Sequence, residues 1–84
     1  MAWLHISEAT AQKIQHRHHL IAEEVRDAVV CQEGLVYVWD DHPERGLRAL
    51  VQVRIRGALT LIVLYPSRDG VDDIYWLGSA YPIE

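Results

Sequence analysis

The stretch that most constrains this chain is residues 45–65, RGLRALVQVRIRGALTLIVLY. Its first half alternates apolar and polar residues, which predicts a strand with one buried face and one polar face. Its second half, 59–65, is apolar at nearly every position and is followed by Pro66, which is typical of a central strand covered on both sides. Gly57 allows a tight reversal between the halves, so the stretch predicts an antiparallel hairpin.

Arginine is concentrated on the polar side of this predicted hairpin. Arg48, Arg54 and Arg56 are expected to share one strand face, with Arg45 just before them and Arg68 in the turn that follows. A guanidinium group stays charged and binds two phosphate oxygens at once, so the pattern suits an RNA phosphate cradle. The alternative is that these arginines only solvate an open sheet face, and the pattern alone leaves both interpretations open.

Two helices are expected before the hairpin. Residues 2–6 are short and apolar and favour an edge strand, and Ser7 then offers an N-cap to a helix that reaches about residue 16. Residues 21–29 carry apolar side chains at intervals of three and four, which predicts a short amphipathic helix. Gly34 is expected to end that helix.

Further strands are expected at 35–39 and 74–80, where β-branched and aromatic residues are frequent, with polar turns at 40–44 and 67–70. This order predicts an α+β fold in which two N-terminal helices pack on one face of a small, mainly antiparallel sheet of four to five strands. At 84 residues the chain is expected to form a single domain, 1–84.

Composition narrows the function classes. A net charge of −4 argues against a protein that coats nucleic acid through bulk positive charge, although the arginines gathered at 45–68 allow a local basic patch. Cys31 is the only cysteine, which excludes an intramolecular disulfide. Neither a signal-peptide pattern nor an apolar run of membrane-spanning length is present, so a cytoplasmic protein is expected.

Cysteine, tryptophan and histidine offer weaker candidate sites. Cys31 has no evident base beside it and is expected to be buried and inert. The three tryptophans can stack on bases but are expected to fill the core and one protein interface. His16 and His19 are spaced to share a helix face and, with His5 or Cys31, could bind zinc; however, a structural zinc site usually takes a second pair of ligands, so no metal or other cofactor is expected.

Five segments occur in a distinctive order: a helix ending in RHH, a helix IAEEVRDAV, a turn DDHPER, a strand GALTLIVLY and a last strand LGSAY. Together they resemble BrnT-like toxins, small members of the RelE/ParE toxin superfamily. The ending SAYP is also similar to the TAYP ending of related bacterial RNase toxin domains. The resemblance covers most of the chain in order and spacing.

This resemblance implies a RelE/BrnT-like fold and the toxin of a type II toxin-antitoxin system. Such a toxin is an endoribonuclease that cleaves RNA without metal and is neutralised by a cognate antitoxin. The expected partners are therefore RNA and an antitoxin protein that covers the arginine face, with no membrane. A homodimer or a toxin-antitoxin heterotetramer is the expected assembly.

Metal-free RNA cleavage needs groups that move protons and cations that stabilise the phosphorane. The proton-transfer candidates are His42, Glu44 and Tyr81, and Arg48 is the candidate for stabilising the transition state. The candidates for RNA phosphate binding are Arg45, Arg54, Arg56 and Arg68.

Two other functions fit the same outline. BrnT-like proteins tend to end their last strand in S-A-R, whereas Tyr81 stands in the arginine position here. That departure and the acidic net charge favour a non-catalytic protein-interaction module on the same fold. RelE itself uses a tyrosine near its C-terminus, which keeps Tyr81 a catalytic candidate, and ParE-like relatives inhibit a topoisomerase instead.

Overall fold

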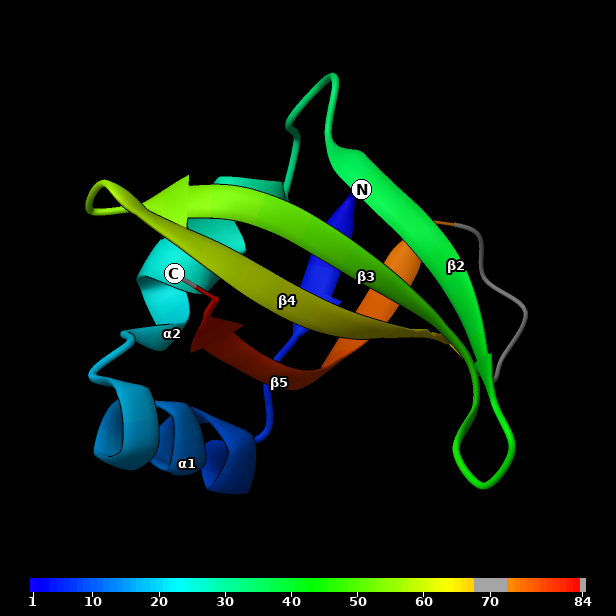
Figure 1. The fold of residues 1–84 in the computed structure, drawn as a ribbon, viewed down its shortest axis with the longest axis horizontal. Coiled ribbons are helices and arrows are strands. Elements are labelled where there is room, and N and C mark those ends of the chain that lie inside the picture. The colour runs from blue at the N-terminus through cyan, green and yellow to red at the C-terminus, as the bar shows by residue number, and fades with distance from the viewer. Residues whose placement is uncertain (68–72, 84) are drawn as a thin grey trace.

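The fold comes from a computed structural model that describes residues 1–67 and 73–83. Its elements, in order, are β1 (Trp3–His5), α1 (Glu8–His18), α2 (Ala22–Val29), β2 (Val36–His42), β3 (Gly46–Ile55), β4 (Ala58–Pro66) and β5 (Ile74–Pro82) (Figure 1). The α+β class predicted from the sequence is therefore confirmed. Of the turn predicted at 67–70, only Ser67 lies among the described residues.

The five strands form one mixed sheet in the order β1-β5-β4-β3-β2. The strands from β2 to β5 pair antiparallel with their neighbours, while β1 joins β5 in parallel. β4 is the central strand, as its continuous apolar run predicts. Arg56 and Gly57 connect β3 to β4 with φ angles of 49° and 79°, so both adopt the left-handed conformation of a tight two-residue hairpin turn.

Some predicted boundaries were wrong. β2 continues through Asp40 and Asp41 to His42, because these residues pair with β3 instead of forming the turn expected at 40–44. α1 runs to His18 and ends where His19 turns left-handed, with a φ of 56°. α2 ends at Val29, before Gly34, because the extended backbone of Val30 stops the helix first.

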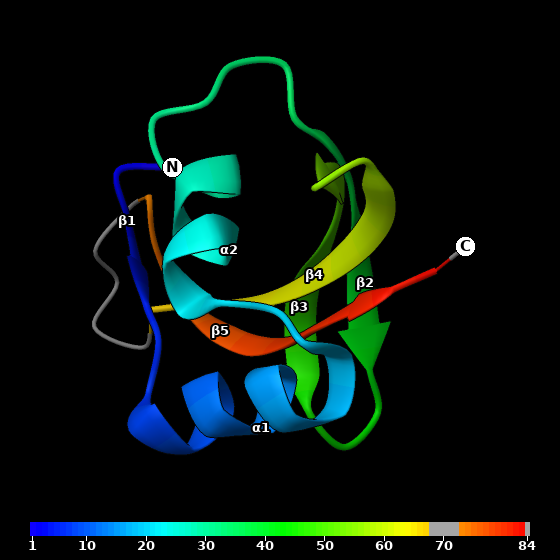
Figure 2. The same cartoon turned by 90° about the vertical axis from the view of Figure 1, so that its left-hand side faces the viewer.

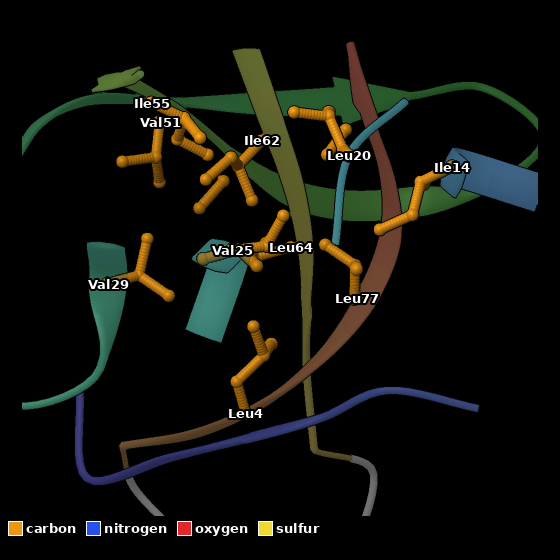
Figure 3. Close-up of a cluster of buried hydrophobic side chains, with 12 residues drawn as sticks. Leu4, Ile14, Leu20, Val25, Val29, Val51, Ile55, Ile62, Leu64 and Leu77 are labelled. Carbon is orange, nitrogen blue, oxygen red and sulfur yellow. The ribbon is translucent and has the colours of Figure 1, made fainter. Parts of the chain in front are cut away.

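The two helices and the inner face of the sheet enclose the core. α2 packs against β3, α1 packs against β5, and the sheet curves around α2 (Figure 2). Ser7 caps α1 as predicted, with its hydroxyl oxygen accepting the Thr10 N–H at 3.1 Å. Figure 3 shows the buried side chains that meet between helices and sheet: Leu4, Ile14, Leu20, Val25, Val29, Val51, Ile55, Ile62, Leu64 and Leu77.

Alternation along β3 separates an inner face, toward the helices, from an outer face. Ala49, Val51 and Ile55 are buried, whereas Gln52 and Arg54 on the other side are exposed. The period-two pattern of this strand is thus confirmed. In the described part of the chain, no helix has the length and apolar character needed to cross a membrane.

The expected core roles of tryptophan and cysteine were wrong. Trp3, Trp39 and Trp76 are each more than 40% exposed, and Cys31 is exposed with a φ of 57°. The core is closed by aliphatic residues instead, so the indole rings are left at the surface. Large exposed aromatic residues are typical of surfaces that contact another molecule.

Candidate functional site

Arg48 is held by groups of its own chain. Its Nε donates a hydrogen bond of 2.7 Å to Asp40 Oδ2 on the neighbouring strand β2, and its side chain is 22% exposed. The hydrogen bond to Asp40, followed by the hydrogen bond to Tyr65, raises the pKa of the Arg48 guanidinium above its ordinary value. This guanidinium is therefore fixed in orientation and partly neutralised.

Arg56 does not share a face with Arg48 and Arg54, contrary to the prediction. It lies in the β3–β4 turn and donates from Nε to Glu24 Oε2 at 2.7 Å and from Nη2 to the other carboxylate oxygen. Nη2 also donates to the His19 carbonyl at 3.3 Å. Arg56 therefore ties the hairpin to the helices instead of lining the outer face.

The remaining predicted arginines are dispersed. Arg54 is on the outer face near the β3–β4 turn, where its Nη1 donates to the Gly57 carbonyl at 3.1 Å. Arg45 is exposed in the β2–β3 turn at the opposite end of β3, and Arg68 lies outside the described residues. Arg45, Arg48, Arg54 and Arg56 therefore do not form a continuous phosphate cradle, which was one of the two interpretations that the sequence left open.

The β2–β3 hairpin end does bring several predicted residues together. His42 ends β2, and Glu44 and Arg45 lie in the turn that follows it. A groove beside this turn is lined by Glu44, Arg45, Leu47, Tyr65, Pro66 and Ser67. His42 Nδ1 accepts the backbone N–H groups of Glu44 and Arg45, each at 3.1 Å. The neutral ring consequently carries its proton on Nε2 and is held in one orientation.

Tyr65 belongs to this site, although it was not among the residues predicted from the sequence. The register that sets Ala49 opposite Leu64 also places Tyr65 opposite Arg48, and its ring lies over Gly78. A Cβ atom at position 78 would lie 2.3 Å from Tyr65 Cε2, so only glycine leaves room for the ring there. The hairpin turn at 56–57 was the available signal, because it fixes which residues of β3 and β4 face each other.

Tyr81 is separate from this group. It pairs with Leu61 near the end of β5, and its ring centre lies 6.0 Å from that of His18 on α1. The structure therefore brings His42, Glu44, Arg45 and Arg48 to one end of the sheet and leaves Tyr81 elsewhere.

The histidines of the α1 end do not converge with other metal-ligand types. His19 serves as the left-handed cap of α1, and its carbonyl accepts the hydrogen bond from Arg56. Within residues 1–67 and 73–83, no group of three His, Cys, Asp or Glu side chains is placed to hold a metal ion.

A second exposed cluster lies on β1 and β5. His5 stacks on Trp76 with ring centres 4.6 Å apart, and the Arg26 guanidinium lies 4.7 Å from the ring centre of Trp3. Arg26 Nε also donates to the Leu4 carbonyl at 3.2 Å, which fixes the guanidinium against the strand.

Comparison of the chain with protein-family models, curated proteins and solved structures gives no match.

Proposed function

We propose that this protein is a toxin of the type II toxin-antitoxin kind, a metal-independent endoribonuclease that acts at the β2–β3 hairpin end of its sheet. The observation that carries the proposal is the grouping of His42, Glu44, Arg45 and Arg48 at this end, beside the groove that Tyr65 helps to line. The resemblance to BrnT-like toxins supports the same reaction. The site is smaller than the arginine face expected from the sequence.

In the proposed reaction, each residue has one task. Glu44 accepts the proton of a ribose 2′-hydroxyl, whose oxygen attacks the adjacent phosphorus. The P–O5′ bond breaks, and the leaving 5′-oxygen takes a proton from water while it accepts a hydrogen bond from the Nε2–H group of His42. Arg45 and Arg48 stabilise the charge on the phosphorane oxygens. The products are a 2′,3′-cyclic phosphate and a free 5′-hydroxyl.

The test is RNA cleavage by the purified protein in excess EDTA, with the 3′ ends of the products analysed. We expect cyclic phosphate ends from the wild type and a loss of about 100-fold in rate for His42→Ala, because the variant lacks the hydrogen-bond donor to the developing charge. Tyr81→Phe is the comparison variant, and we expect it to cleave as the wild type does. Cleavage that survives His42→Ala, or that Tyr81→Phe abolishes, would contradict the hairpin site.

A second candidate function is a non-catalytic interaction module on the same fold. The ion pairs Asp40–Arg48 and Glu24–Arg56 favour it, because they occupy guanidinium groups that phosphate binding would need. Expression of the chain by itself separates the two candidates. Growth arrest with RNA degradation supports the toxin, and rescue by a co-expressed antitoxin is then expected; unchanged growth with intact RNA supports the module.

A further inference from the structure

β2 is an edge strand that exposes large apolar residues on both of its faces. Among the described strands it pairs with β3 alone. Its first four residues, from Val36 to Trp39, are between 48% and 65% exposed. Proteins usually protect such an edge with lysine, proline or a bulge, and none of these occurs at 36–39.

We propose that a second copy of this chain covers the edge, through antiparallel pairing of β2 with the β2 of the other copy. The two-fold axis passes between the two Val38 residues, which face each other. Tyr37 then faces the other copy's Trp39, and Val36 faces the other copy's Asp40. The contact is self-complementary and joins the two sheets into one continuous sheet.

Aromatic side chains support a second copy as the occupant. Tyr37 and Trp39 lie on the inner face with ring centres 6.2 Å apart in an edge-to-face arrangement, and Trp39 lies 6.4 Å from Tyr75. Two-fold pairing continues this row with the same residues of the other copy. Aromatic pairs across neighbouring strands stabilise a sheet. Because β2 carries both Tyr37 and Trp39, two copies of the same strand can form such pairs with each other.

Aromatic pairing and charge together favour the axis at Val38, because only this axis sets Tyr37 opposite the other copy's Trp39. Positions 36–39 carry no charge, and the carboxylates of β2 are confined to Asp40 and Asp41. An axis at Asp40 would set two like charges directly opposite each other, which destabilises strand pairing. The axis at Val38 separates them, and the Asp40 carboxylate is already paired with Arg48.

A groove on the inner side of β2 adds an independent observation. It has a volume of about 150 Å³, and its lining includes Leu35, Tyr37, Trp39 and Tyr75. In the proposed pairing the other copy's Trp39 lies opposite Tyr37, at the rim of this groove. The second copy therefore covers the groove as well as the edge.

Sedimentation equilibrium from about 1 to about 300 µM tests the proposal, since association depends on concentration by mass action. We expect the mass to rise toward twice the 9.7 kDa of one chain. Because each copy has a net charge of −4 and the contact centre is uncharged, added salt should strengthen the dimer. A single-chain mass at every concentration would overturn the proposal.

A pair of charge variants tests the register. Val38→Lys and Val38→Glu each place like charges opposite each other at the axis, so each alone should weaken association by at least about tenfold. Mixing the two variants should restore dimers of one copy of each, because lysine then faces glutamate. Leu47→Lys is the matched control, since Leu47 is 51% exposed and lies outside β2, and it should associate as the wild type does.

Two outcomes would overturn the pairing at Val38. One is an equal loss of association in Val38→Lys and Leu47→Lys, and the other is a mixture of the two Val38 variants that stays monomeric. The proposal is independent of RNA cleavage, so a catalytically inactive protein would leave it intact.

Discussion

Glu24 on α2 and Arg56 in the β3–β4 turn form an ion pair that joins the second helix to the central hairpin. Arg56 donates to both carboxylate oxygens and also to the His19 carbonyl at the end of α1. One guanidinium group therefore connects the turn with both helices. The contact fixes where the hairpin ends relative to α2, on the side of the sheet that the helices occupy.

This ion pair makes stability depend on pH. The hydrogen bond from Arg56 lowers the pKa of Glu24 below its ordinary value of 4.5, so the folded protein resists protonation of this carboxylate more than the unfolded chain does. The contribution to stability is therefore complete above about pH 4.5 and is lost as the pH falls through the lowered pKa. We expect Glu24→Gln to lower the free energy of unfolding slightly at pH 7 and to match the wild type in strong acid.

Chemical denaturation over a pH series measures this difference. Glu33→Gln, which removes an exposed carboxylate outside the helices, is the control for the general effect of charge. A gap between wild type and Glu24→Gln that stays constant down to strong acid would contradict the role of the ion pair.

Gly78 is predicted to be required for the position of Tyr65. In Gly78→Ala the new methyl group would lie 2.3 Å from Tyr65 Cε2, so the ring must move. We expect a loss of about 1–3 kcal/mol in the free energy of unfolding, the usual cost of overpacking. In the Tyr65→Ala background the ring is absent, so adding Gly78→Ala should cost much less than it does in the wild type. The double-mutant cycle should therefore show coupling between the two positions. Additive effects would mean that the two residues do not compete for the same space.

Much of the fold follows from the sequence because local patterns and pairing geometry agree. Alternation in β3, the apolar run of β4 and Gly57 between them fix the central hairpin and hence its register. The extent of β2 did not follow, because Asp40 is a turn former by type and becomes a strand residue only through its pairing with Arg48. Tertiary pairing overrides local preference there.

The candidate site was less predictable for the same reason. Alternation gives the face of a strand arginine but does not show which carboxylate lies within reach of it. Arg56 follows the period of β3 in the sequence, yet the left-handed turn redirects it to Glu24 on α2. The opposition of Tyr65 and Arg48 was accessible from the hairpin turn, whereas the contact between Tyr65 and Gly78 depends on the bulge between β4 and β5.

Asp40 is predicted to limit binding of RNA by Arg48. Because the Asp40 carboxylate accepts the Arg48 Nε at 2.7 Å, Asp40→Asn should free the guanidinium for phosphate. We expect affinity for single-stranded RNA to rise about threefold to tenfold at fixed ionic strength. The matched control is Asp41→Asn, which removes the same charge from the adjacent residue of β2, opposite Leu47. Equal gains in the two variants, measured by fluorescence anisotropy, would assign the effect to net charge alone.

Arg45 and Arg54 are predicted to differ in their importance for RNA cleavage, although both are exposed. Arg45 directly precedes β3, and Arg54 lies within β3 near its other end. Arg45 lines the groove at the β2–β3 end, whereas Arg54 lies toward the β3–β4 turn and donates to the Gly57 carbonyl. Removing one cation that stabilises developing charge costs about 100-fold in rate, so Arg45→Ala should lose cleavage by that factor while Arg54→Ala retains it. Single-turnover cleavage of a labelled RNA in EDTA measures both variants. Equal losses in the two variants would mean that the reaction uses arginines along the whole outer face. Full activity in both variants would exclude Arg45 from the mechanism.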